Sequence, residues 1–363
     1  MSRPSNFADV RHLLQTRFQQ RPYAAAQLYV SRHGRPLLNT AVGEAQPGVP
    51  LTAESIMYWS CAAKPLLALA VGQLIDDGYL GFDDRVADHL PDFAAGGKGD
   101  ITVEHILSHA GGFRFPAGPG PYREPFDDAV RRVLRMEGEA AWTPGEDQGY
   151  HQDTAWYVLA ALVESLRGHD FTEVIHTEIT KPLGMSSTWA AMTPEGYASA
   201  APRLAVPTFV SPGGIRRWPY LISRAACGTK NPCYGGYGPM SDLGRLYEAS
   251  LDATQGSGEF AVSARTLTDM VASPRGRSHD RTFKRDCDYG RGFMRDLSGH
   301  WGFGTRWSGS SFGTCGLVGH VCAGADPRTG VVIACAFGAL TVDGEDTGQI
   351  MDYIYDLAAG SPI

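Results

Sequence analysis

The segments of this chain with strand character lie near its two ends, and a long helix-rich stretch separates them. Near the N-terminus the pattern is that of a β-hairpin that turns at Arg32-His33-Gly34-Arg35. This order of segments predicts one antiparallel sheet built from both chain ends, and therefore an α+β fold. The segments expected to form strands are 24–31, 36–42, 301–307, 313–323 and 331–337.

Helical periodicity predicts the remaining elements. Helices are expected at 7–18, from about 61 to Gly78, at 347–358, and, between the strand-rich ends, at 103–108, 125–136, 154–166 and 171–179. We therefore expect residues 1–78 and 235–363 to form a sheet lobe and residues 79–234 to form a helical lobe. Pockets form where such lobes meet, so the functional site is expected in the cleft between them.

Composition argues against several functional classes. The 363 residues are 43% hydrophobic and 20% charged, as in ordinary globular proteins. The formal net charge is −7 and the basic residues are scattered, which argues against a nucleic acid or an anionic membrane as partner. Because there is no apolar leader and no apolar run of membrane length, we expect a cytoplasmic protein that acts on small molecules, in an oligomeric state the sequence leaves open.

The seven cysteines are an odd number, and none shows the CxxC spacing of metal sites. Free thiols are therefore expected, with no metal and no cofactor. Cys227 and Cys233 flank a Gly/Pro loop and could form a bridge only in an exported protein. Cys322 and Cys335 lie in apolar runs and are expected in the core.

The segment Trp59-Ser60-Cys61-Ala62-Ala63-Lys64-Pro65 carries the strongest chemical signal. Proline is tolerated only in the first turn of a helix, so Pro65 predicts a helix that begins near Cys61. A helix N-terminus favours a thiolate, and Lys64 lies one turn further on the same face, where it can stabilise that anion or accept a proton. Taken alone, these residues also fit a buried cysteine beside a lysine that reaches solvent.

Several segments, in the same order, resemble the serine β-lactamase and penicillin-binding protein family, above all the class C β-lactamases with their esterase and D-aminopeptidase relatives. The family's Ser-x-x-Lys motif corresponds to Cys61 and Lys64, so a cysteine takes the place of the nucleophilic serine. Ser60 is the alternative nucleophile, although a packing or capping role fits it better. Further matching segments are 78–84 with 90–91, 106–112, 182–185 with Thr188, and 240–245.

The resemblance also implies a catalytic tyrosine. Family members carry Tyr-x-Asn a few residues after a Pro-Gly turn, and here Pro144-Gly145 precedes Tyr150-His151-Gln152. It implies that Tyr150 is a phenolate, kept ionised by Lys64, which relays protons to and from the nucleophile. Gln152 replaces the asparagine and is expected to bind substrate. A Cys61–His151 pair is the alternative, but adjacent residues at a helix entrance point apart, so His151 should face away.

A third family motif, Lys/His-Thr/Ser-Gly, corresponds to Thr314-Cys315-Gly316, and all three residues are expected to contact substrate. Gly316 would allow a substrate backbone to approach closely, and the N–H groups of Cys61 and Leu317 would form the oxyanion hole. The motif's cation is missing, which weakens the case for a substrate carboxylate. Arg306 and His320 could compensate, although surface roles are favoured. Cys315 also brings a second thiol near Cys61, with which it could form an oxidised pair, although an inert small residue in place of Thr or Ser is the simpler interpretation.

Three functions follow, in order of preference. Amines attack a thioester readily and water attacks it poorly, so the cysteine favours an acyltransferase that passes an acyl group from Cys61 to an amine or alcohol in specialised metabolism. The second function is a hydrolase of the same fold, acting as an esterase, amidase or peptidase. The third is a binding protein without activity, which the retention of Lys64 and Tyr150 argues against.

Overall fold

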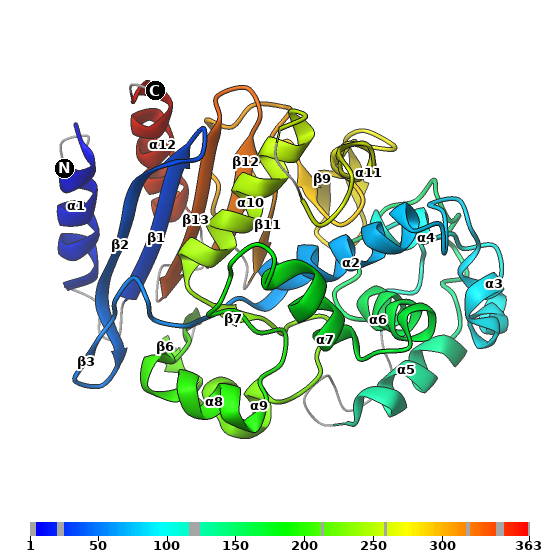
Figure 1. Ribbon diagram of the computed structural model, residues 1–363. Coiled ribbons are helices and arrows are strands. Elements are labelled where there is room, and N and C mark those ends of the chain that lie inside the picture. Colours follow the sequence, from blue (N-terminus) through cyan, green and yellow to red (C-terminus); the bar gives the residue numbers. More distant parts are fainter. Residues whose placement is uncertain are drawn as a thin grey trace.

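The computed structural model describes residues 5–19, 25–115, 124–211, 214–257, 260–316, 320–338 and 345–361. Its centre is a nine-stranded antiparallel sheet in the order β3-β2-β1-β13-β12-β11-β10-β9-β8, in which strands from the two chain ends meet at β1 and β13 (Figure 1). The strands are β1 (Ala25–Arg32), β2 (Arg35–Gln46), β3 (Val49–Pro50), β8 (Ser278–Asp280), β9 (Arg285–Tyr289), β10 (Met294–Arg295), β11 (Phe312–Gly316), β12 (Val321–Asp326) and β13 (Val331–Gly338). The expected α+β fold, with one sheet made by both chain ends, is confirmed.

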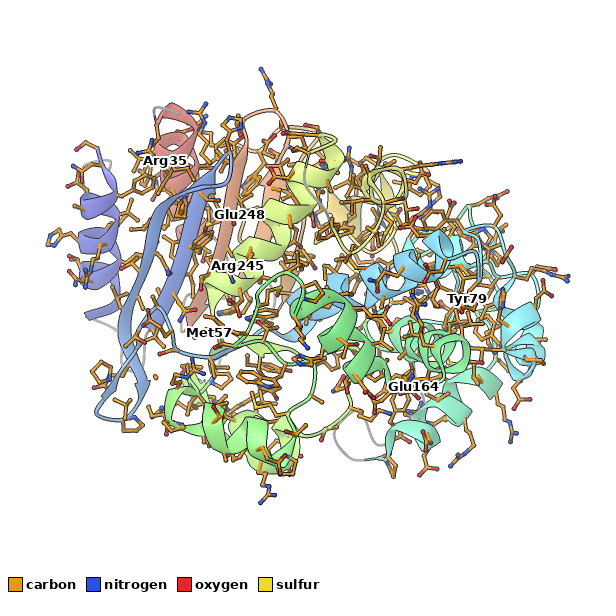
Figure 2. The ribbon with its side chains drawn as sticks, viewed as in Figure 1. Arg35, Met57, Tyr79, Glu164, Arg245 and Glu248 are labelled. Atoms are coloured by element: carbon orange, nitrogen blue, oxygen red, sulfur yellow. The ribbon has the colours of Figure 1, made fainter. Side chains whose placement is uncertain are left out.

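Helices cover both faces of the sheet. Helices α1 (Phe7–Gln19) and α12 (Glu345–Gly360) pack on one face, and α10 (Met240–Thr254) packs on the other (Figure 1). The pleat of β1 explains this, since Leu28 belongs to the cluster of α1 and α12 while Tyr29 belongs to the cluster of α10. Tyr29 donates a hydrogen bond from its hydroxyl to Oε1 of Glu248 at 2.7 Å, which joins α10 to the sheet. Glu248 is labelled on that helix in Figure 2.

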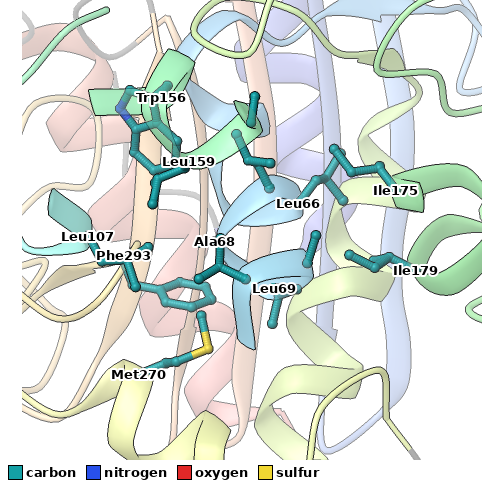
Figure 3. Close-up of a cluster of buried hydrophobic side chains, with 14 of the residues drawn as sticks. Leu66, Ala68, Leu69, Leu107, Trp156, Leu159, Ile175, Ile179, Met270 and Phe293 are labelled. Carbon is teal, nitrogen blue, oxygen red and sulfur yellow. The ribbon is translucent and has the colours of Figure 1, made fainter. Parts of the chain in front are cut away.

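Helix α2 (Lys64–Asp76) carries the lysine of the first motif and is buried on nearly every side (Figure 3). Its apolar side chains, among them Leu66 and Leu69, pack against α6 (Thr154–Arg167), η3 (Ile175–Thr180) and α11 (Ala264–Val271). A helix that is apolar all round requires such an environment. Because this packing fixes α2 in the core, its N-terminal end is a rigid support for reactive groups.

The remaining helical elements lie mostly between residues 86 and 227. They are α3 (Val86–His89), η2 (Pro91–Gly97), α4 (Val103–Leu107), α5 (Phe126–Arg135), α7 (Phe171–Val174), α8 (Pro194–Ala200), η4 (Ala201–Arg203), η5 (Pro219–Ile222) and α9 (Arg224–Cys227). Two small sheets pair β4 (Met57–Tyr58) with β7 (Tyr237–Gly238), and β5 (Thr208–Ser211) with β6 (Gly214–Arg217). In the described part of the chain, no helix is both long and apolar enough to cross a membrane.

Two strand predictions were wrong. Residues 301–307 form turns, because Gly302 and Gly304 adopt φ angles of 78° and 74° that reverse the chain repeatedly. The segment 313–323 is not one strand but parts of β11 and β12, which pair so that Cys315 faces Cys322. None of the seven cysteines forms a disulfide, and Cys322 and Cys335 are fully buried as expected.

Candidate active site

Cys61 lies where the chain passes from β4 into α2. Residues Ser60–Ala63 form a 3₁₀ turn, η1, that continues into α2 with Pro65 in the first turn of that helix, so the expected helix start is confirmed. Trp59 anchors the turn, since its indole Nε1 donates to the carbonyl oxygen of Gly238 at 2.8 Å. Ser60 has a φ of 54°, a left-handed conformation that is uncommon for residues with side chains and that clusters at functional sites.

Ser60 does not cap the helix. Its hydroxyl donates a hydrogen bond to Sγ of Cys61 at 3.9 Å, and both side chains line the same cavity. Cys61 is 8% exposed and Ser60 is 2% exposed, so the cysteine is the more exposed of the two residues. This geometry favours Cys61 as the nucleophile and gives Ser60 a supporting hydrogen bond.

Lys64 is buried beside the cysteine. Its Nζ donates to the carbonyl oxygens of Gln152 at 2.9 Å and Cys233 at 3.0 Å. The same atom lies 5.2 to 5.4 Å from the centroids of three aromatic rings, which are those of Tyr150, Trp156 and Tyr234. With 3% of its surface exposed, Lys64 does not reach solvent, so the alternative of a lysine extended to the surface is wrong.

Tyr150 lies just before α6 and faces the cysteine. Its side chain and that of Cys61 line the same cavity, close enough for a charge on the sulfur to act on the phenol. Burial raises the pKa of Tyr150 well above its ordinary value, and a negative charge on Cys61 raises it further. The expected phenolate is therefore wrong for the resting site, where Tyr150 is a neutral phenol that can donate a hydrogen bond and a proton.

Two residues, Asp280 and His109, hold the loop of Tyr150 in place. The carboxylate of Asp280, fully buried at the end of β8, accepts from the backbone N–H of Tyr150 at 2.9 Å through Oδ2 and from the N–H of Phe283 at 2.7 Å through Oδ1. His109 accepts the N–H of Gly149 on its carbonyl oxygen at 3.0 Å, and its ring lies 4.6 Å from the Tyr150 ring. Neither residue was predicted to serve the site.

His151 faces away from the cavity, as expected. It is fully buried, and its Nε2 accepts the backbone N–H of Phe113 at 3.3 Å. Burial lowers the pKa of His151 to about 3, so the ring is neutral. The alternative of a Cys61–His151 pair is therefore wrong.

The end of strand β11 lies against the cysteine turn. A β-carbon on Gly316 would come within 2.6 Å of the Trp59 carbonyl oxygen and 3.1 Å of the Cys61 nitrogen. Gly316 is thus required by the protein's own backbone, and its expected contact with a substrate backbone stays a prediction. The expectation for Thr314 is corrected, because strand alternation buries its side chain and only Cys315 of this motif lines the cavity.

The other residues predicted near the third motif have different outcomes. Leu317, the second expected oxyanion donor, lies outside the described residues. Arg306 forms a surface ion pair with Asp356 at 3.3 Å, and the ring of His320 bonds to the carbonyl oxygen of Phe337 at 3.0 Å, so neither lines the cavity of Cys61. Cys315 and Cys61 both line that cavity and both are free thiols.

The cavity in front of Cys61 has a volume of about 570 Å³, within the range of small-molecule sites. It is lined by Tyr58, Ser60, Cys61, Tyr150, Gln152, Trp218, Leu221, Tyr234, Thr282, Phe283, Met294, Trp301 and Cys315. Gln152 is among these residues, and its role in substrate binding stays a prediction. Most aromatic residues of the lining were not foreseen, since they come from short or irregular segments distant in sequence. In the described ranges, no three His, Cys, Asp or Glu side chains converge as a metal site requires.

A family model described as Beta-lactamase matches residues 10–349, so the chain belongs to the β-lactamase family. One relative is Esterase/beta-lactamase LipL of Mycobacterium tuberculosis, 23% identical over 365 residues that cover 92% of this chain and 81% of LipL. A penicillin-binding protein homolog from Caulobacter crescentus has a TM-score of 0.79 at 24% identity, covering 98% of this chain and 99% of that one. EstCE1, described as a hydrolase with promiscuous acyltransferase activity, has a TM-score of 0.78 at 20% identity and covers 98% of both chains. The chain is therefore an enzyme of this family, a hydrolase or an acyltransferase.

Proposed function

We propose that the protein is an acyltransferase of specialised metabolism that carries its acyl group as a thioester on Cys61. The observation that carries this proposal is a cysteine at a helix entrance, in one cavity with a neutral Tyr150 and beside the buried Lys64. A thioester resists water more than it resists amines, so this nucleophile favours transfer. The description of EstCE1 shows that a structural neighbour combines hydrolysis with acyl transfer, which supports the proposal.

In the first half of the reaction, the Cys61 thiolate attacks the carbonyl carbon of an ester, thioester or activated amide. The N–H of Cys61 would stabilise the resulting oxyanion, and that of Leu317 remains the predicted second donor. Tyr150 then gives its phenolic proton to the leaving heteroatom as the carbon–heteroatom bond breaks. The products are the acyl-thioester, the protonated leaving group and a phenolate at Tyr150.

In the second half, the acceptor amine or alcohol attacks the thioester carbonyl and gives its proton to the Tyr150 phenolate. Collapse of the second tetrahedral intermediate expels the Cys61 thiolate and restores the neutral phenol. Lys64 keeps its ammonium near both anions, held by the Gln152 and Cys233 carbonyl oxygens. Its charge offsets whichever of the two groups is ionised at each step.

The second candidate is hydrolysis, with water in place of the acceptor. It is favoured by the relation to LipL, which is described as an esterase and β-lactamase. The two functions share the acylation half and differ only in what enters the cavity afterwards.

Intact-mass analysis with a series of activated acyl donors tests the covalent step. We expect one acyl adduct on the parent protein, none on Cys61→Ala, and an undiminished adduct on Cys315→Ala, which removes the other thiol of the cavity. An adduct on Ser60 in Cys61→Ala, or undiminished turnover by that variant, would refute the mechanism. Release of the acyl group that is accelerated in proportion to amine concentration indicates transfer, whereas release independent of amine indicates hydrolysis.

A further inference from the structure

We propose that the leaving group and the acceptor are uncharged aromatic alcohols or amines, bound against a wall formed by Tyr150, Phe283 and Trp301. This inference rests on the proposed function, because it names the molecules that exchange an acyl group with Cys61. Three observations lead to it: the absence of charge in the cavity lining, the geometry of the three rings, and the position of the proton donor.

The cavity offers no partner for a charged substrate group. Among the described residues, its lining contains no Asp, Glu, Lys, Arg or His side chain. A carboxylate placed there would lose its hydration without gaining a counter-ion, which is strongly unfavourable. The lysine nearest to the cysteine donates to two carbonyl oxygens, lies among three rings and is not part of the lining.

The three rings form a preassembled aromatic surface. The rings of Tyr150 and Phe283 are stacked, with centroids 4.9 Å apart and planes inclined by 25°. The ring of Trp301 meets Phe283 edge to face, at 4.4 Å and 72°. The guanidinium of Arg285 lies 5.0 Å from the Trp301 ring, and Asp280 fixes the backbone of Phe283. Further aromatic rings bind such surfaces in offset or edge-to-face geometry more strongly than saturated rings of equal size do.

The position of the proton donor decides which part of the substrate meets this wall. The Tyr150 hydroxyl must reach the heteroatom that leaves in acylation or attacks in deacylation. A substituent on that heteroatom therefore lies beside the Tyr150 ring, and the stacked Phe283 continues the surface outward. Tyr58 and Leu221 belong to a separate hydrophobic cluster of the protein and form a different part of the lining, which leaves room for the acyl chain.

Three esters of one acyl group test the inference, with benzyl, cyclohexylmethyl and 4-carboxybenzyl leaving groups of similar size. Formation of the Cys61 adduct is followed by intact mass to give a second-order rate constant for each ester. We expect the benzyl ester to react roughly 2- to 10-fold faster than the cyclohexylmethyl ester, and at least about 10-fold faster than the carboxylated one. In Phe283→Leu the benzyl preference should fall to about one, with the cyclohexylmethyl ester little changed.

Phe82→Leu is the matched control, because Phe82 is, like Phe283, a partly buried phenylalanine but lies outside the cavity. It should keep the parent's benzyl preference. Equal rates for the three esters, faster reaction of the carboxylated ester, or a benzyl preference that survives in Phe283→Leu would each overturn the inference. In each of these three outcomes an adduct on Cys61 still forms. Failure of the proposed function would instead give no adduct with any of the esters.

Discussion

At the residue scale, the charge state of Tyr150 beside Cys61 differs from the one that the family resemblance implies. Two anions side by side in a buried site would repel each other, and this is why a thiolate at Cys61 raises the pKa of Tyr150. At each step, therefore, only one of the two groups carries a negative charge, either the Cys61 sulfur or the Tyr150 oxygen. The tyrosine begins the cycle as an acid and becomes a base only after the leaving group has taken its proton.

A pH profile of acylation tests this order of events. Because the pKa of Tyr150 is raised well above its ordinary value, the phenol stays protonated through the alkaline range and the acylation rate should not decline between about pH 8 and pH 10. Tyr150→Phe keeps the ring stacked on Phe283 but removes the proton, so the rate should fall by about 10²- to 10⁴-fold. An alkaline decline with a midpoint below about pH 9 in the parent protein would contradict a neutral tyrosine.

Asp280 is a positioning residue whose loss should alter specificity as well as rate. Its two oxygens accept four hydrogen bonds, of which the hydroxyl of Tyr289 and the N–H of Thr282 make two, at 2.9 and 2.8 Å. In Asp280→Asn one oxygen becomes an NH₂ group that faces former donors, so Tyr150 and Phe283 should shift. We expect the acylation rate to fall roughly 10- to 100-fold, as small misplacements of reacting groups do, and the benzyl preference to decline with it.

The control for this variant is Asp286→Asn on the neighbouring strand β9. The Asp286 side chain is 66% exposed and contacts His279 at 3.6 Å, so neither rate nor preference should change. If Asp280→Asn lowered the melting temperature but left the benzyl preference intact, Asp280 would be structural only.

At the element scale, the site depends on how closely strand β11 approaches the η1 turn. Gly316→Ala would place a methyl group 2.6 Å from the backbone oxygen of Trp59 and 3.0 Å from the nitrogen of Ala62, and backbone atoms cannot yield cheaply. We expect the strand and turn to separate and acylation to fall by about 100-fold, measured as the rate of Cys61 adduct formation. Gly309→Ala, with nothing within 4 Å of the added carbon, should be neutral, and equal effects of the two variants would refute the argument.

The elements that the sequence predicts well are those with strong local signals. Pro65 marks the start of α2, and the hairpin at 32–35 and helix α6 occur where their patterns place them. Strands β8 to β10 were missed because segments of two to five residues show too little alternation to be recognised. These short strands carry Asp280 and Met294 and border Phe283, so the part of the site hardest to predict is the part that contacts the leaving group.

At the scale of the whole molecule, the active site exists only when distant stretches of the chain assemble. Cys61 comes from the passage between β4 and α2, Tyr150 from the loop before α6, and Phe283 from the β8–β9 connection. The same assembly buries histidines that carry no charge in the folded state. Burial lowers the pKa of His300 to about 4 and that of His151 to about 3.

These histidines predict a loss of stability in mild acid. Their folded-state pKa values lie below the ordinary 6.5, so between about pH 6.5 and their folded values the unfolded chain binds more protons and unfolding becomes easier as pH falls. Each should lower the free energy of unfolding by about 2 kcal/mol between pH 7 and pH 5. Denaturant unfolding at both pH values measures the change.

His300→Phe isolates one of these contributions. In the described part of the chain neither ring nitrogen of His300 has a hydrogen-bond partner, so phenylalanine removes the proton site while keeping a ring in the core. Because the carboxylates titrate alike in both proteins, their contribution cancels when the pH dependence of the variant's stability is compared with that of the parent. Between pH 7 and pH 5, the free energy of unfolding of the variant should fall by about 2 kcal/mol less than that of the parent. An unchanged pH dependence in His300→Phe would show that His300 takes up its proton in the folded protein as readily as in the unfolded chain.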